Sequence, residues 1–131
     1  MKKIEVVAAI IVHNDLILCA QRSENKLNYI SNKFEFPGGK IEPGESKKEA
    51  LKRELIEELN IKPNIKDLYL SVVHKYPDFE LIMHSFICIA ETMNVTLNEH
   101  KSYKWLKREE LNCLDWAAAD LPIVKKLMNN D

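Results

Sequence analysis

The sequence predicts a mixed α/β (α+β) fold, in which helices pack on both faces of a mixed β-sheet. Two observations predict it: apolar, β-branched runs recur along the chain, and two segments with helical spacing give the order β-β-loop-helix-β-β-β-helix. The length of 131 residues fits one domain over residues 1–131, large enough to bury a core without disulfides or a structural metal.

The first two strands are expected to form a hairpin. Residues 4–13 are almost uninterrupted apolar and β-branched, residues 16–21 are a second apolar run, and Asn14-Asp15 between them suits a tight turn. A polar, irregular stretch follows, and residues 34–36 are then a short strand candidate directly before a glycine-containing loop.

The next element is a helix that begins at about Ser46. Ser46 and Glu49 form a capping box, in which the hydroxyl and the carboxylate satisfy the first free N–H groups of the helix. Leu51, Leu55 and Leu59 then form an apolar stripe at helical spacing. Asn60, followed by Pro63, marks the end of this helix.

The second half of the chain predicts more strands and a final helix. Residues 68–75 and 81–90 are apolar runs joined by a turn with proline and aspartate, which predicts a second hairpin, and residues 103–106 suit one more short strand. Residues 121–128 have helical spacing, and Asp120 is well placed as the N-cap of that helix. The order of the elements favours a mixed sheet with helices packed on both faces.

Composition excludes several classes of protein. With a net charge of −1 and dispersed lysines, the chain is not expected to bind a nucleic-acid polymer. The longest apolar run, residues 6–12, is too short to span a bilayer, and the N-terminus lacks a signal-peptide core, so we expect a cytoplasmic protein with no membrane partner. Cys19, Cys88 and Cys113 have no ligand spacing, so we expect buried, reduced thiols and no zinc site.

The glycines of this chain point to one loop. Gly38, Gly39 and Gly44 are the only three, and all lie within residues 37–45, directly before the glutamate-rich helix. Glycine is needed where φ is positive or where the backbone approaches a ligand closely. A loop of this kind ahead of a capped helix offers backbone N–H groups to a phosphate.

The helix that follows carries carboxylates on one face. Glu54, Glu57 and Glu58 lie within one arc, where like charges repel unless a cation lies between them. Oxygen-only ligands suit a hard ion, Mg²⁺ or Mn²⁺, and Glu45 could add one more oxygen. A solvated helix face is the alternative, but the adjoining glycine loop favours a phosphate with a divalent cation.

Arg53 lies off that acidic face. Glu49 is four residues before it and Glu57 four residues after it, so a Glu-Arg-Glu ladder could hold Glu57 in place. A plain surface ion pair is the alternative interpretation.

Residues 39–61 resemble the Nudix box. The pattern is Gly39, five residues, Glu45, seven residues and then residues 53–61, and it matches over 23 positions except at Asn60, where the family usually has glycine. Asparagine is the next-best residue for a left-handed helix end. The resemblance extends to residues 4–11, 20–22, 34–45, 99–100 and 119–122, which are similar to the MutT branch, above all to its CTP pyrophosphohydrolase and 8-oxo-dGTP diphosphatase members.

This resemblance implies a Nudix-type α/β/α sandwich and an activity. The implied reaction is Mg²⁺-dependent hydrolysis of a nucleoside triphosphate to the monophosphate and pyrophosphate, with Mn²⁺ able to substitute. The implied role is sanitising of the nucleotide pool for DNA replication and repair, with CTP, modified cytidine triphosphates or 8-oxo-dGTP as substrate. The partner would be this small molecule, and the protein a monomer or a weak homodimer.

The resemblance also implies roles for residues at the phosphate end of the substrate. The metal ligands would be Glu54, Glu57 and Glu58 together with the Gly38 carbonyl. Arg53 would belong to the catalytic set, and Glu54, Glu57 or Glu99 would take the proton from water, with Glu54 as the first choice. Arg22 and Lys40 would contact the substrate.

Base recognition is implied for four further residues. Phe36, Tyr76 and Phe79 could stack on the base, although aromatic residues at such positions also serve as core packing. Asp120 stands where purine-selective MutT proteins carry asparagine, and an aspartate accepts a hydrogen bond from cytosine N4. Phe79 stands where a MutT arginine would contact the nucleotide. Both observations favour a cytosine nucleotide over 8-oxo-guanine.

Three other functions stay open at this point. An ADP-ribose or dinucleotide hydrolase of the same family is one, although such relatives usually add an N-terminal region. A non-catalytic nucleotide-sensing module is the second, although the glutamates of the box are all present. The third is an acidic helix that serves only as a protein-binding surface.

Overall fold

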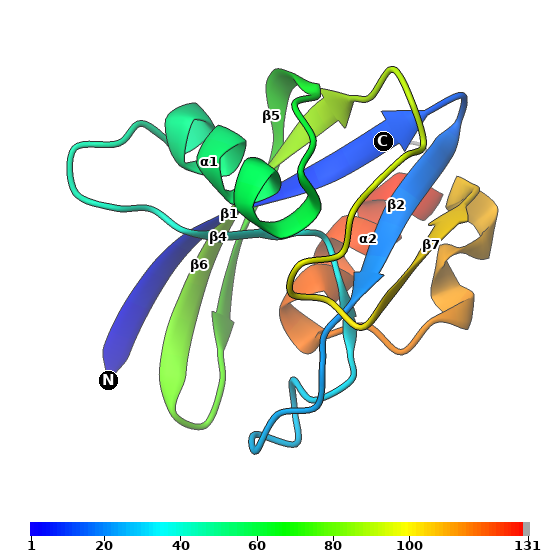
Figure 1. The fold of residues 1–131 in the computed structure, drawn as a ribbon. Helices are drawn as coiled ribbons and strands as arrows, with labels where there is room; N and C mark the ends of the chain where they lie inside the picture. The colour runs from blue at the N-terminus through cyan, green and yellow to red at the C-terminus, as the bar shows by residue number, and fades with distance from the viewer. Residues whose placement is uncertain (130–131) are drawn as a thin grey trace.

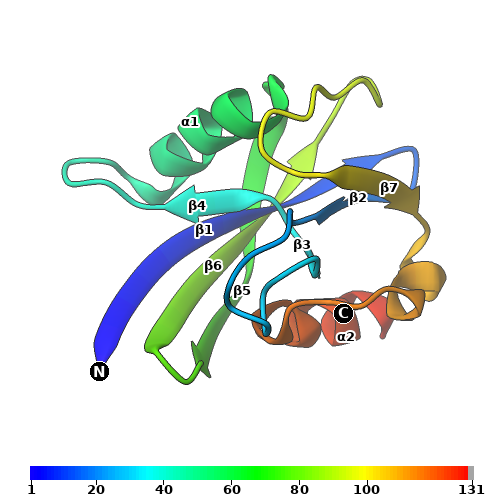
Figure 2. The same ribbon diagram turned by 60° about the horizontal axis from the view of Figure 1, so that its bottom comes forward.

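A computed structural model, which describes residues 1–129, places one β-sheet between two α-helices (Figures 1 and 2). The strands are β1 (Lys2–His13), β2 (Leu16–Gln21), β3 (Phe34–Glu35), β4 (Gly38–Lys40), β5 (Asn64–Lys75), β6 (Phe79–Ile89) and β7 (Ser102–Leu106). The helices are α1 (Lys47–Leu59) and α2 (Leu121–Met128), and the 3₁₀ helices η1 (Arg108–Cys113) and η2 (Ala118–Asp120) precede α2.

β1 lies at the centre of the sheet, whose main path runs β3-β2-β1-β6-β5. It pairs in parallel with β6, from Lys2 opposite Phe79 to Val12 opposite Ile89. On its other edge it pairs antiparallel with β4 and, at its end, with β2. Parallel and antiparallel pairs in one sheet confirm the mixed sheet that the sequence predicts.

The sheet separates two hydrophobic cores, because successive side chains of a strand point to opposite faces. On one face, Val7, Ala9 and Ile11 of β1 pack in the same core as the leucine stripe of α1. On the other face, Ala8 and Ile10 pack in the core that α2 covers. Figure 2 shows α1 and α2 on opposite sides of the sheet, which confirms the predicted fold class.

Both ends of α1 are confirmed as predicted. The Ser46 hydroxyl accepts a hydrogen bond from the Glu49 N–H at 3.1 Å, and the Glu49 carboxylate accepts one from the Ser46 N–H at 2.8 Å. Asn60 ends the helix in the left-handed conformation, with φ 54°, so asparagine serves where glycine is the more usual residue. These caps fix the direction in which the glutamates of α1 point.

The two predicted hairpins are also present. Asn14 and Asp15 both have positive φ, 47° and 67°, as a tight turn between β1 and β2 requires. The second hairpin is longer than predicted, because β5 begins at Asn64 and not at Leu68. The pairing of β5 with β6 has irregularities on either side of Leu68. Such bulges interrupt the regular alternation that marks a strand in the sequence.

One strand and one thiol differ from the sequence-based expectation. β4 forms within the glycine loop, where glycine gives no strand signal in the sequence. Cys19 and Cys88 are buried and burial raises the pKa of each thiol to about 12, but Cys113 is exposed in η1. The prediction of three buried cysteines is therefore wrong for Cys113.

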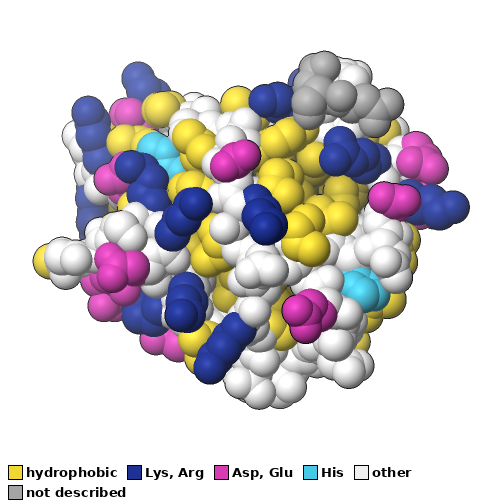
Figure 3. All heavy atoms as spheres, turned by 90° about the horizontal axis from the view of Figure 1, so that it is seen from above, with side chains coloured by type: hydrophobic (Ala, Val, Ile, Leu, Met, Phe, Trp, Pro, Cys, Tyr) yellow, Lys and Arg dark blue, Asp and Glu magenta, His cyan; other side chains and the backbone are white. Residues whose placement is uncertain are grey.

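The surface carries mixed charges. On the face shown in Figure 3, both basic and acidic side chains are scattered, and hydrophobic side chains show between them. Within residues 1–129, no helix has the length and apolar character needed to cross a membrane.

Candidate active site

A cleft of about 500 Å³ opens beside β4. It lies between residues 22–25, which follow β2, and the side of α1 that carries Glu54 and Glu58. Ten of the residues predicted for the site line it. They are Arg22, Phe36, Gly38, Lys40, Glu54, Glu58, Tyr76, Phe79, Glu99 and Asp120. The predicted catalytic residues Arg53 and Glu57 are not among the residues that line the cleft.

Two glycines allow β4 to lie against its neighbours. A Cβ atom on Gly39 would lie 2.4 Å from the carboxylate carbon of Glu54, and one on Gly38 would lie 1.9 Å from the carbonyl oxygen of Val7. Neither distance is possible for a real side chain. The glycines are therefore required for the close approach of β4 to both β1 and the glutamates of α1.

Glu58 is a buried carboxylate with one oxygen that is unpaired within residues 1–129. Its side chain is buried, and its Oε1 atom has no hydrogen-bond partner among the residues that the structure describes. Burial, followed by repulsion from Glu35, Glu54 and Glu99, raises the pKa of Glu58 to about 9. A cation beside this oxygen would relieve both the desolvation and the repulsion.

Glu54 and Glu57 lie in different surroundings, although they share α1. Burial raises the pKa of Glu54, which also accepts a hydrogen bond from Arg53 at 2.9 Å. The Glu57 side chain is 56% exposed, and its Oε2 atom lies at a long distance of 3.5 Å from Arg53 Nη1. Glu54 and Glu58 therefore face the cleft, while Glu57 lies at its outer side.

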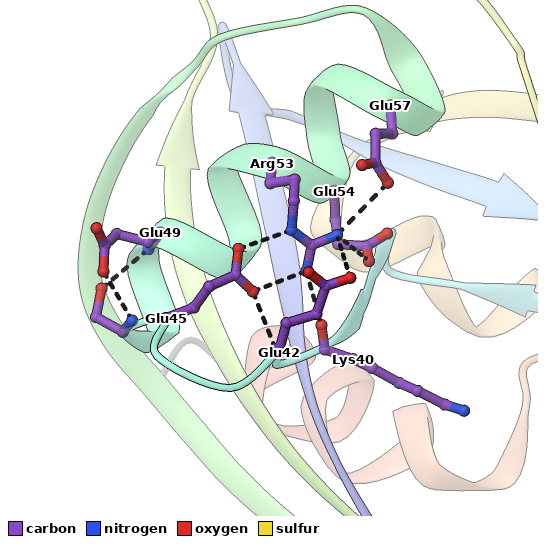
Figure 4. Close-up of polar contacts among 8 residues, drawn as sticks. Lys40, Glu42, Glu45, Glu49, Arg53, Glu54 and Glu57 are labelled. Atoms are coloured by element: carbon purple, nitrogen blue, oxygen red, sulfur yellow. Dashed lines mark hydrogen bonds and ion pairs between the residues drawn. The ribbon is translucent and has the colours of Figure 1, made fainter.

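Arg53 acts as a clamp between the loop and α1 (Figure 4). It binds both oxygens of Glu45, at 2.7 Å and 2.9 Å, and donates to the Lys40 carbonyl at 3.0 Å. The hydrogen bonds from Arg53 lower the pKa of Glu45 to about 2. The Lys40 ammonium points away from this clamp.

The clamp corrects one expectation. Glu49 is not part of an ion-pair ladder, because its carboxylate is held in the capping box with Ser46. Glu45 takes the place of Glu49 beside Arg53, and both of its oxygens are engaged there. Glu45 is thus held by Arg53, a contact that the sequence did not predict for it.

The donor set fits a hard divalent cation in its chemistry. Among residues 1–129, no three His, Cys, Asp or Glu side chains are gathered closely enough to hold a metal without movement. The cleft nevertheless brings Glu54, Glu58 and Glu99 to one end, and the free buried oxygen of Glu58 points to a missing positive partner. Carboxylate oxygens alone are the ligands that Mg²⁺ and Mn²⁺ prefer.

Sequence reasoning missed Glu35 as a site residue. Glu35 accepts hydrogen bonds from Arg22 Nη1 at 3.0 Å and from His100 Nε2 at 2.9 Å, and all three residues line the cleft. An acidic residue between two buried phenylalanines, directly before the glycine loop, was the available signal. The sequence indicated His100 only through the family resemblance of residues 99–100.

The other end of the cleft is aromatic. Phe36 is buried and stacks on Trp116 at 4.7 Å between ring centroids, so its ring mainly packs in the core. The Tyr76 hydroxyl accepts a hydrogen bond from the Ala119 N–H at 3.1 Å, and its ring lies 5.2 Å from that of Phe79. Phe79, half-buried at the start of β6, is the more accessible of these rings.

Asp120 is buried at this aromatic end. Its Oδ1 atom accepts a hydrogen bond from the Phe36 N–H at 3.0 Å, and it makes no capping hydrogen bond to α2. Asp120 therefore stands at the N-cap position of α2 as predicted, but its side chain does not cap the helix, and its backbone is helical because it also ends the 3₁₀ turn of η2. Burial, and next the charge of Glu35, raises the pKa of Asp120 well above its ordinary value.

The sequence and the fold have known relatives. A family model of the NUDIX domain matches residues 2–127. The CTP pyrophosphohydrolase of Escherichia coli K12 is 38% identical over 130 residues, which cover 98% of this chain and 93% of that protein. The 8-oxo-dGTP diphosphatase of the same organism is 31% identical over 128 residues, covering 97% and 98%.

A solved structure agrees with these relatives. The solution structure of the MutT protein, a Nudix hydrolase, from methicillin-resistant Staphylococcus aureus 252 covers 100% of both chains, with 40% identity and a TM-score of 0.76. The chain therefore belongs to the Nudix family and is a hydrolase. Its relatives place it in the MutT-like branch of that family.

Proposed function

We propose that this protein is a Mg²⁺-dependent nucleoside triphosphate pyrophosphohydrolase that sanitises the nucleotide pool of the cytoplasm. It would convert a nucleoside triphosphate and water to the monophosphate and pyrophosphate. The observation that carries this proposal is the two-ended cleft, in which Glu58, with its unpaired buried oxygen, lies at one end and Asp120 lies at the aromatic end. Such a cleft matches a ligand with phosphates at one end and a base at the other.

Metal binding is assigned to the carboxylate end. Glu54 and Glu58, with the Gly38 carbonyl, would hold Mg²⁺, with Mn²⁺ as a substitute, and Glu57 is the remaining proposed ligand. When bound, the ion supplies charge neutralisation on the phosphates and a water of lowered pKa. The weak contact between Glu57 and Arg53, at 3.5 Å, leaves that carboxylate available.

Proton transfer and phosphate binding are assigned to the chain itself. Glu54 takes the proton of the attacking water, and its raised pKa suits a group that must accept one; Glu99 is the other candidate base. Arg22, at the cleft lining, binds a phosphate. Arg53 keeps Glu54 in place through its 2.9 Å hydrogen bond.

Cytosine is the base that we propose. Asp120 is buried in the lining of the aromatic end, where its carboxyl group can accept a hydrogen bond from the N4 amino group of cytosine. Phe79 and Tyr76 line the same end and would pack against the base.

Two relatives support a triphosphate substrate, since one is named a CTP pyrophosphohydrolase and the other an 8-oxo-dGTP diphosphatase. Their names leave two bases, cytosine and 8-oxo-guanine, to test. The test measures release of pyrophosphate and orthophosphate from CTP, 5-modified cytidine triphosphates, 8-oxo-dGTP, unmodified dGTP and ADP-ribose, each with Mg²⁺. We expect pyrophosphate, and the highest kcat/KM for a cytosine nucleotide.

Variants of α1 serve as controls in this assay. Glu58→Gln and Glu54→Gln are expected to abolish turnover, whereas Lys52→Gln, on the exposed face of the same helix, is expected to leave it unchanged. A preference for 8-oxo-dGTP would overturn the choice of base. Turnover of ADP-ribose alone, or of no nucleotide, would overturn the proposed reaction in favour of a dinucleotide-type hydrolase or a sensing module.

A further inference from the structure

We propose that Glu35 and His100 form a relay that positions Arg22 for the substrate phosphates, with His100 as its buried end. This inference rests on the proposed function, in which Arg22 binds a phosphate. It adds two positioning residues that act through Arg22, and it explains why a buried histidine side chain and a half-buried glutamate lie beside the cleft.

The contacts form a continuous chain from the interior to the cleft. Arg22 Nη1 donates to Glu35 Oε1 at 3.0 Å, and His100 Nε2 lies 2.9 Å from Glu35 Oε2. Since an ionised carboxylate only accepts hydrogen bonds, His100 must carry its proton on Nε2. Each oxygen of Glu35 therefore has one donor, and neither is free to turn toward another partner.

Burial increases along this chain. The side chains of Arg22, Glu35 and His100 are 39%, 17% and 5% exposed, respectively. A buried, packed imidazole is a fixed point, whereas an arginine at 39% exposure has many accessible rotamers unless something holds it. The relay transfers the fixed position of His100 to the guanidinium of Arg22, whose remaining N–H groups stay available for an anion.

The backbone around the relay is also held in place. β2 pairs with β3 at Ala20 opposite Glu35, which fixes the glutamate relative to the strand that leads into Arg22. The segment that carries His100 is tied to the same strand end, because the Lys101 N–H donates to the Gln21 carbonyl at 3.0 Å. Three distant segments thus meet at Glu35.

The negative charge of Glu35 gives a second reason for its contact with His100. Glu35 lies close enough to Glu58 and Asp120 to repel their carboxylates. Without donors on both oxygens, this repulsion could turn the Glu35 carboxylate away from the acidic end and move the guanidinium of Arg22 with it. His100 prevents this rotation by holding the oxygen that Arg22 does not bind.

A double-mutant cycle tests the relay. We expect His100→Ala to lower kcat/KM for the triphosphate about tenfold, and to have no further effect in the Arg22→Ala background. His100→Gln, whose amide can donate to the same Glu35 oxygen, is expected to recover most of the loss. Additive effects of the two alanine substitutions would overturn the proposal.

A second measurement needs no substrate. Nuclear magnetic resonance of the Arg22 guanidinium in the free protein reports its rotation, and we expect faster rotation in His100→Ala while the backbone amide spectrum stays folded. If His100→Ala does not fold, Glu35→Gln, which keeps the side-chain shape, must loosen Arg22 in the same way. Unchanged rotation of Arg22 overturns the relay, whereas a wild-type protein without turnover contradicts only the proposed function.

Discussion

At the scale of single residues, Asp120 shows how burial changes the chemistry of a carboxyl group. Its side chain is buried, and its pKa is raised well above the ordinary value of 3.8. Between that value and the folded-state pKa, the folded protein keeps a proton that the unfolded chain has released. The free energy of unfolding therefore falls as pH rises through this window, by at most about 1.4 kcal/mol per pH unit.

Asp120→Asn should remove this pH dependence. The amide oxygen can still accept the Phe36 N–H, but no proton has to be retained. We expect the variant to be more stable than the wild type at pH 7, with the difference vanishing below pH 4. Urea unfolding at several pH values measures it, and a difference that grows toward low pH would contradict the assignment.

Gly39 offers a test of the close approach between β4 and α1. Because a Cβ atom there would lie 2.4 Å from the Glu54 carboxylate carbon, Gly39→Ala must displace Glu54. We expect a loss of about 100-fold in kcat/KM, as for other misplaced catalytic groups.

Gly44→Ala is the matched control for that substitution. Gly44 has open space around its Cα atom but a φ of +84°, so alanine there is strained without touching the site. We expect a loss of about 1 kcal/mol in the free energy of unfolding, with kcat/KM unchanged. Equal losses of activity in both variants would show that Glu54 is not the group affected.

At the scale of elements, the caps of α1 determine where the site glutamates point. Ser46→Ala removes the hydroxyl that accepts the Glu49 N–H, and is expected to lower the free energy of unfolding by about 1 kcal/mol. Denaturant unfolding beside a Lys52→Ala control on the exposed face of α1 measures this. No difference between the two variants would mean that the capping box contributes nothing.

Local signals explain why so much of the fold could be predicted. The Asn14-Asp15 turn, the Ser46 and Glu49 box and the Asn60 helix end are encoded within a few residues, and each is present as expected. Asp120 stands at the N-cap position as predicted, but its carboxylate accepts from the Phe36 N–H, 84 residues away in the chain, and makes no hydrogen bond to α2. No local pattern reports such a contact.

The site was predictable to the extent that it follows from α1 and the glycine loop. Glu54 and Glu58 share the cleft because helical spacing places them there. The exchange of Glu49 for Glu45 beside Arg53 depends instead on how the loop folds back over the helix. Glu35 and His100 meet only through the pairing of strands, so sequence spacing could not bring them together.

At the scale of the whole molecule, the buried thiols report opening of the sheet. Cys19 on β2 and Cys88 on β6 are buried, whereas Cys113 is exposed. We expect one of the three thiols to react rapidly with a maleimide in the native protein, and all three in denaturant. Mass spectrometry counts the labels, and rapid native labelling of Cys19 or Cys88 would contradict the described core.

The parallel pairing of β1 with β6 also determines when the protein can fold during its own synthesis. β1 leaves the ribosome before β6, and this partner is complete only when residue 89 has emerged, since Val12 pairs with Ile89. Until then a largely apolar central strand has no parallel neighbour, and the nascent chain exposes an edge prone to aggregation. We therefore expect the hairpin of β1 and β2 and helix α1 to form before β6 emerges, and the force that a folding nascent chain exerts to appear only after residue 89 has left the ribosome.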